Sequence, residues 1–293
     1  MDQDQSPLMR IPAEIRIMIY EHLLDDGGEK KLLIRNKGTH QLQAGALKTC
    51  RRSAYRVIER SFHRQCYETT YHLATKTSMH PAIMAVNRQI HRETSHMLYG
   101  LHDFDFGSDI EAVVPFLKDL APESLSMLRE MTVRKSGPMY HCESDRLDWQ
   151  HMCRYLRGLD KMIPKIRIVV EGGEPTRAWE GPQTLGVSDL RLLALIKHDS
   201  MEWISELQQV QGIQELEIVP HMRYLPKPST TATLLFAAFS RSIDTALVDY
   251  LRTDCITSSP RLPGAPSFNI AVSLSVTHDS ASLDAPNNFD YCV

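Results

Sequence analysis

The sequence lacks the cysteine spacing that would indicate a disulfide framework or a zinc site. Its six cysteines are scattered over 293 residues, without the closely spaced Cys pairs of structural zinc sites. The first residues are acidic and polar, so they lack the basic and then apolar order of a secretory leader. We therefore expect free thiols in a reducing compartment, the cytoplasm or the nucleus.

Long apolar runs are also missing. The longest extends from Leu234 to Phe239, far short of the roughly 20 residues that a membrane-spanning helix needs. We therefore expect no membrane as a partner. Hydrophobic residues still make up 42% of the chain, which is enough for a sizeable core.

Catalytic and metal motifs are absent as well. The sequence contains no Gly-x-Ser-x-Gly, the motif that carries the nucleophile of many hydrolases. Residues 171–177 read Glu-Gly-Gly-Glu-Pro-Thr-Arg, which lacks the Lys-Ser/Thr pair of a phosphate loop and has acids that repel phosphate. His91 and His96 stand five residues apart, whereas a helical zinc pair is four apart. We expect no enzymatic activity, no cofactor and no metal site. An enzyme of unfamiliar type stays an alternative, because one sequence does not show which polar residues converge.

A basic stripe runs along residues 46–66, whose apolar spacing predicts an amphipathic helix. Its cations recur every fourth residue and are Lys48, Arg52, Arg56, Arg60 and Arg64. They form either a solvated helix face or a surface for an acidic partner. Nucleic acid is the less favoured partner, because no aromatic residues interleave with the stripe to stack on bases and the chain carries a net charge of −3.

Helices and short apolar strands alternate from residue 103 onward, with strands expected near residues 105, 132, 168 and 217 and one long helix over residues 231–253. This alternation predicts a small, mostly parallel sheet with helices packed on it, an α+β or irregular α/β fold. We divide the chain into three parts: an N-terminal helical region with an inserted strand–helix–strand, residues 1–107; an irregular helix–strand array with a capping helix, residues 108–255; and a disordered tail rich in Ser, Pro, Ala and Asn, residues 256–293.

Two N-terminal motifs resemble those of fungal F-box-like proteins. Residues 11–24 read Ile-Pro-Ala-Glu-Ile-Arg-Ile-Met-Ile-Tyr-Glu-His-Leu-Leu, similar to a first F-box helix with an Arg after Glu-Ile and an Ile-Tyr pair. Residues 85–106 read Ala-Val-Asn-Arg-Gln-Ile-His-Arg-Glu-Thr-Ser-His-Met-Leu-Tyr-Gly-Leu-His-Asp-Phe-Asp-Phe. They contain the Arg-Gln-Ile, the Glu three residues on, the Leu-Tyr and the Phe-containing strand of such proteins. A long insertion separates the two motifs, whereas an F-box continues directly into its second and third helices.

The resemblance implies a protein-interaction function without catalysis. An F-box docks on a Skp-type adaptor of a cullin-RING ubiquitin ligase, and the region after it binds the protein to be ubiquitinated, here an unknown target. The residues assigned to the adaptor are Ile11, Pro12, Ile15, Ile19 and Leu23.

Two alternatives to adaptor docking stay open. In the first, the chain is a stand-alone scaffold without a ligase link. In the second, Ile15, Ile19 and Leu23 belong to the domain's own core. For the target we single out Trp179, in the Gly- and Pro-bounded loop 172–182, as an exposed aromatic contact.

Overall fold

The computed structural model describes most of the chain in twelve segments. These are residues 7–24, 30–36, 55–57, 67–69, 71–74, 79–136, 143–159, 163–175, 184–210, 213–225, 230–258 and 269–272. Within them lie a seven-stranded sheet, a two-stranded sheet and the helices that pack on the larger sheet.

The larger sheet has the strand order β4-β1-β5-β6-β7-β8-β9. In that order its strands are Tyr71–Leu73, Lys31–Asn36, Asp103–Gly107, Glu130–Lys135, Ile163–Pro175, Ile213–Leu225 and Asn269–Val272. Every neighbouring pair is parallel except β1 with β4. The smaller sheet pairs β2 (Tyr55–Val57) with β3 (Tyr67–Thr69) in antiparallel orientation.

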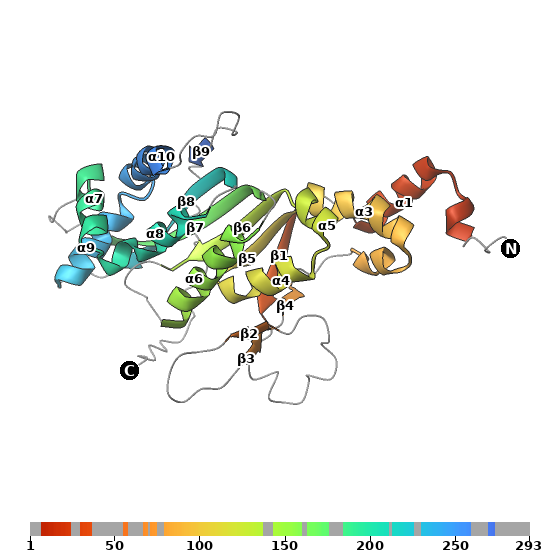
Figure 1. The fold of residues 1–293 in the computed structure, drawn as a ribbon, viewed down its shortest axis with the longest axis horizontal. Helices are drawn as coiled ribbons and strands as arrows, with labels where there is room; N and C mark the ends of the chain where they lie inside the picture. The colour runs from red at the N-terminus through yellow and green to blue at the C-terminus, as the bar shows by residue number, and fades with distance from the viewer. Residues whose placement is uncertain are drawn as a thin grey trace.

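From β5 to β9, each parallel strand is followed by helices and then by its immediate neighbour in the sheet. The crossover elements are η4 (Ile110–Ala112), α4 (Val113–Asp119), α5 (Pro122–Met127), α6 (Glu143–Arg157), α7 (Val187–Leu195), η5 (Asp199–Met201), α8 (Glu202–Gln208), α9 (Thr231–Ser240) and α10 (Ala246–Ser258). Right-handed crossovers that always advance to the next strand place their helices on one face of a sheet. Figure 1 shows this row of strands with α7, α9 and α10 gathered around its β8–β9 end.

The N-terminal helices lie at the opposite end of the sheet (Figure 1). They are η1 (Pro7–Arg10), α1 (Ala13–Leu24), η3 (Pro81–Ala85) and α3 (Arg88–Leu101). The Asn87 side chain accepts a hydrogen bond from the Ile90 N–H at 2.8 Å and so caps the start of α3. The His80 N–H donates to the Leu23 carbonyl at 2.8 Å, which ties the end of α1 to the approach of η3.

The core lies between the helices and the face of the sheet turned toward them. Side chains alternate along the strands, so Ile166 and Ile168 of β7 and Leu216 and Ile218 of β8 point into this core. Trp149 of α6 is 1% exposed, and its indole N–H donates to the Trp203 carbonyl of α8 at 2.9 Å. The two indole rings meet edge to face with centroids 5.6 Å apart. This pair holds α6 and α8 together above the middle of the sheet.

The fold class expected from the sequence is confirmed, because helices pack on a mostly parallel sheet. The division into domains at residues 107 and 255 stays a prediction. The sheet includes β1, β4 and β5 from before residue 107 together with β6 to β9 from after it.

Several expected elements differ from the structure. The helix predicted over 46–66 is wrong for residues 55–57, which form β2; pairing with β3 overrides the local helical spacing. The single helix over 231–253 is two helices, α9 and α10, separated by a turn at residues 241–245. β9 lies inside the segment 256–293 that was expected to be disordered, because it pairs with residues 215–218 of β8.

Removing the Trp149 side chain tests the core. We expect Trp149→Ala to lower the free energy of unfolding by about 3–5 kcal/mol, because it leaves a large cavity between α6 and the sheet. Leu195→Ala is the control, since Leu195 is 80% exposed and its truncation should cost less than about 0.5 kcal/mol. Urea denaturation followed by circular dichroism measures both; equal losses would contradict the assignment of Trp149 to the core.

Candidate protein-docking site on the first helix

One face of α1 is buried. Arg16, Tyr20 and Leu24 follow one another at four-residue spacing and are 7%, 0% and 1% exposed. Residues four apart lie on the same side of an α-helix, so these three form a continuous stripe toward α3. A charged residue in such a stripe needs a partner, because an unpaired buried charge is strongly unfavourable.

Glu93 of α3 is that partner. The Arg16 guanidinium donates to both of its carboxylate oxygens, from Nη2 at 2.7 Å and from Nε at 3.1 Å. The Tyr20 hydroxyl donates to Oε2 at 3.0 Å, and the Gln89 side-chain amide donates to Oε1 at 2.9 Å. Arg16 also donates to the Ile11 carbonyl at 2.7 Å. Bidentate arginine–carboxylate pairs are among the stronger and more directional ion pairs, so this cluster fixes how α1 lies on α3.

The cluster perturbs the titration of its members. The hydrogen bond from Arg16 outweighs burial and lowers the pKa of Glu93 to about 2. The same hydrogen bond raises the pKa of Arg16, and burial raises the pKa of the Tyr20 hydroxyl. The carboxylate therefore stays charged well below neutral pH, and the anchor between α1 and α3 persists there.

The opposite face of α1 presents exposed apolar side chains, together with the exposed polar residues Glu14 and His22. Ile15 is 47% exposed and Met18 is 62% exposed, and Ile17 at the flank is 40% exposed. Ile19, one helical turn after Ile15, is half-buried. A rigidly held helix that presents large apolar side chains to solvent has the form of an element that lays its apolar face into a partner's groove.

The residues predicted to contact an adaptor all lie in the described part of the chain. Pro12 and Ile15 are exposed, whereas Ile11, Ile19 and Leu23 are half-buried. None of the five is fully buried. The alternative that Ile15, Ile19 and Leu23 serve the domain's own core stays open for the half-buried Ile19 and Leu23.

Other predicted contacts lie outside the described residues. These are Lys48, Arg52, Arg60, Arg64 and Trp179. Arg56 belongs to β2, where only the backbone is described.

Sequence reasoning missed two parts of this site. Met18, the most exposed apolar residue of α1, was not among the residues assigned to the adaptor. Val86 is 58% exposed, because η3 ends at Ala85 and α3 begins only at Arg88, and nothing in the sequence singles it out. The sequence does contain a signal for the contact between α1 and α3. Arg16 and Tyr20 stand four residues apart in the first motif, and Glu93 stands in the second.

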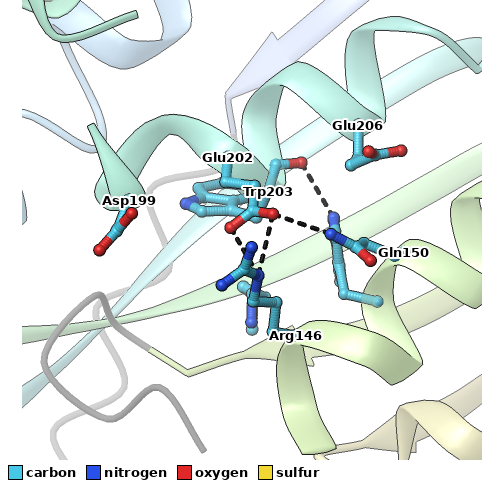
Figure 2. A pocket seen from close by; sticks show the side chains of 8 residues that line it. Arg146, Gln150, Asp199, Glu202, Trp203 and Glu206 are labelled. Atoms are coloured by element: carbon cyan, nitrogen blue, oxygen red, sulfur yellow. Dashed lines mark hydrogen bonds and ion pairs between the residues drawn. The ribbon is translucent and has the colours of Figure 1, made fainter. Parts of the chain in front are cut away.

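A second polar cluster lies between α6 and α8 and lines a small surface pocket. Figure 2 shows Arg146 and Gln150 of α6 turned toward Glu202 of α8. The Arg146 Nε donates to the Glu202 carboxylate at 2.8–2.9 Å, and the Gln150 amide donates to it at 2.8 Å. Beneath them Lys135 is 1% exposed. These polar groups are engaged with one another, so the cluster fastens the two helices.

Lys135 has two partners at the base of this pocket. Its ammonium group pairs with Asp145 and lies 5.6 Å from the centre of the Trp149 ring. A buried ammonium requires such compensation for its lost hydration. The contacts therefore account for a charged side chain in the helix-facing layer of the sheet.

Among the described residues, no three His, Cys, Asp or Glu side chains are grouped as a metal ion would require. Within the same segments, no helix has the length and apolar character needed to cross a bilayer.

The Arg16–Glu93 ion pair between α1 and α3 predicts that the stability of the fold depends on pH. The pKa of Glu93 is about 2 in the folded chain and 4.5 without perturbation. A lowered folded pKa contributes stability that is present above the unfolded value and is lost as the pH falls through the folded value. Between pH 5 and pH 2, the free energy of unfolding of the wild type should therefore fall.

Glu93→Gln should reduce the free energy of unfolding at pH 7 by about 1–3 kcal/mol, since it leaves Arg16 without its carboxylate. The difference from wild type should shrink as the pH approaches 2. Denaturant titrations at a series of pH values measure this. A constant difference across the range would contradict the role of the Glu93 charge.

One family model matches the chain over residues 1–198, and its description is Domain of unknown function (DUF7730). The match contains α1, α3 and the sheet strands from β1 to β7, and ends just after α7. No curated protein and no solved structure matches the chain. Because the match spans more than half of its 293 residues, the chain belongs to the DUF7730 family.

Proposed function

We propose that this protein is a non-enzymatic, F-box-like interaction protein that docks on a Skp-type adaptor through the apolar face of α1. It would serve as a substrate-recognition subunit of a cullin-RING ubiquitin ligase, with ubiquitin transfer carried out by other subunits. The observation that carries the proposal is the exposure of Ile15 and Met18 on a helix whose other face is anchored to α3.

The two faces of α1 favour docking on energetic grounds. Burying an exposed apolar side chain contributes about 25 cal/mol per Å² of apolar surface. The helix is already formed and is held by the Arg16–Glu93 pair, so a partner does not have to order it. Preorganisation of this kind lowers the entropic cost of association.

The F-box resemblance and the helix packing support each other. Arg16 and Tyr20 come from the first motif and Glu93 comes from the second, and all three meet in one cluster. The long insertion therefore leaves the two helices in contact, as a helical adaptor-docking unit requires.

A stand-alone scaffold without a ligase link is the second candidate. The observation that favours it is the position of β1 and β4, which come from the segment between α1 and α3 and belong to the large sheet. An F-box is a compact helical unit, whereas here the docking helices share one sheet with the rest of the chain. In this case the apolar face of α1 would bind a partner other than a Skp-type adaptor.

Charged substitutions on the exposed face of α1 test whether this face docks on a Skp-type adaptor. The Ile15→Asp/Met18→Asp variant should lose co-purification with a Skp-type protein, with affinity at least about tenfold weaker, because two anchors become charged groups that resist burial. Both positions are exposed, so the melting temperature should stay near that of the wild type. Pull-down with purified adaptor and isothermal titration calorimetry are the measurements.

The matched control is Leu192→Asp/Leu195→Asp on α7. These leucines are 57% and 80% exposed and belong to a different helix, so the control adds the same charge without touching α1. It should bind the adaptor as the wild type does. If the wild type itself shows no affinity for the adaptor, the ligase role is excluded and the scaffold remains.

A further inference from the structure

The face of the large sheet that points away from the core carries charged residues in register. Neighbouring strands place Glu130 of β6 beside Lys165 of β7, and Lys165 beside Glu215 of β8. Two residues further along, Arg167 lies beside Glu217. A parallel sheet normally has apolar residues on both faces because helices cover both, so a charged face indicates a surface with another use.

Ion pairs connect these residues across three strands. The Lys165 ammonium lies 3.4 Å from Glu130 and 2.7 Å from Glu217, and Arg167 lies 2.9 Å and 3.0 Å from the same two carboxylates. Burial works to raise the pKa of Glu217, but hydrogen bonds from Lys165 and Arg167 outweigh it and the pKa is lowered. The centre of the face is therefore a fixed network of paired charges.

A second cluster lies nearer the carboxyl ends of the strands. Glu171 of β7 is between two arginines: Arg223 of β8 donates to it at 2.8 Å, and Arg134 of β6 lies 3.7 Å from it. One carboxylate with two guanidinium groups leaves one positive charge in excess. This end of the face is thus locally cationic.

Acids and bases occupy different depths. The carboxylate side chains of Glu130, Glu171 and Glu217 are 5%, 9% and 3% exposed. The basic side chains above them reach solvent: Arg167 is 31% exposed, Arg134 37% and Arg223 57%. An approaching molecule therefore meets guanidinium groups first.

These guanidinium groups keep unused donors. The Nε atoms of Arg134 and Arg167 are buried and have no hydrogen-bond partner among the described residues. The hydroxyl of Thr132, which lies on β6 two residues before Arg134, also has no hydrogen-bond partner among these residues. Glu130 Oε1 and Glu217 Oε2 likewise have no hydrogen-bond partner among the described residues, so the buried network is incompletely satisfied, which is rare in folded proteins. The solvent-exposed parts of the arginine side chains, not the buried Nε atoms, are what a carboxylate could reach.

We infer that the sheet face around Arg134, Arg167 and Arg223, which lies opposite the core formed with the described helices, is a docking surface for an acidic segment of a partner protein. Carboxylates on such a segment would accept from the outward guanidinium groups while the buried glutamates hold those groups in place. The binding surface itself does not depend on the proposed function. Only the identification of the partner as the target recruited for ubiquitination rests on that function. A short acidic segment is favoured over nucleic acid, because the excess positive charge is confined to Arg134 and Arg223 around Glu171. The exposed Glu215 elsewhere on the face would repel any anion that extended along the whole sheet.

Binding is measured on the purified full chain by fluorescence anisotropy with a fluorescein-labelled oligoglutamate peptide. An oligoglutamine peptide of the same length and a single-stranded oligodeoxynucleotide are the comparison probes. We expect the oligoglutamate to bind with affinity that falls as salt rises and the oligoglutamine not to bind. Tighter binding of the oligodeoxynucleotide, or no binding of oligoglutamate at low salt, would overturn the inference.

Paired variants locate the surface. Arg134→Gln/Arg223→Gln should weaken oligoglutamate binding about tenfold, because two charge-assisted contacts are lost. Arg92→Gln/Arg154→Gln is the control, since it removes the same charge from exposed positions on α3 and α6. Equal losses in the two variants would show a general charge effect and overturn the assignment.

Glu171→Gln should change the affinity for oligoglutamate in the opposite direction. Removing the carboxylate beneath Arg134 and Arg223 should tighten oligoglutamate binding, because the peptide no longer competes with it. A misfolded variant does not produce such a gain, and weaker binding would contradict the inference. The Ile15→Asp/Met18→Asp variant should bind the peptide as the wild type does, so failure of adaptor docking and failure of this surface are distinguishable.

Discussion

The arrangement of the N-terminal part depends on the ion pair between Arg16 and Glu93. It joins residues 77 positions apart in the chain through two parallel hydrogen bonds of 2.7 and 3.1 Å. Arg16 is nearly buried and would be strongly unfavourable without its carboxylate. Only one rotation of α1 satisfies it, and that rotation turns Ile15 and Met18 outward. A polar contact thus decides which apolar residues are available to a partner.

The two faces of the large sheet also differ in how charge is placed. Its helix-facing side is built mainly from Ile, Leu, Val, Met and Phe side chains, with Lys135 as a paired exception. The other side carries a network of paired acids and bases. From β5 to β9 consecutive strands are neighbours, so these described strands contain no reversal of order of the kind that creates a crevice. Both of our proposals accordingly place recognition on surfaces, the exposed face of α1 and the charged face of the sheet.

Much of the fold could be predicted from the sequence, because local patterns are strong there. The apolar alternation around Ile166 and Leu216 located β7 and β8, and helical spacing behind Pro12 located α1. The prediction failed where distant pairing decides the structure. β2 within a helical pattern depends on β3, and β9 depends on an open edge of β8. For the candidate site, spacing showed that Ile15 and Ile19 share a side of the helix, but exposure depends on Glu93, a residue in another motif.

The direct passage from α3 into β5 gives the two surfaces a fixed geometry. α3 ends at Leu101 and β5 begins at Asp103, and the single residue between them, His102, is buried with its ring nitrogen against the Met97 and Leu98 carbonyls. α3 therefore passes into β5 through one buried residue, and α1 is anchored to α3 by the Arg16–Glu93 pair. If both proposals hold, partners bound to α1 and to the charged sheet face would be held at a set distance and orientation by this short connection.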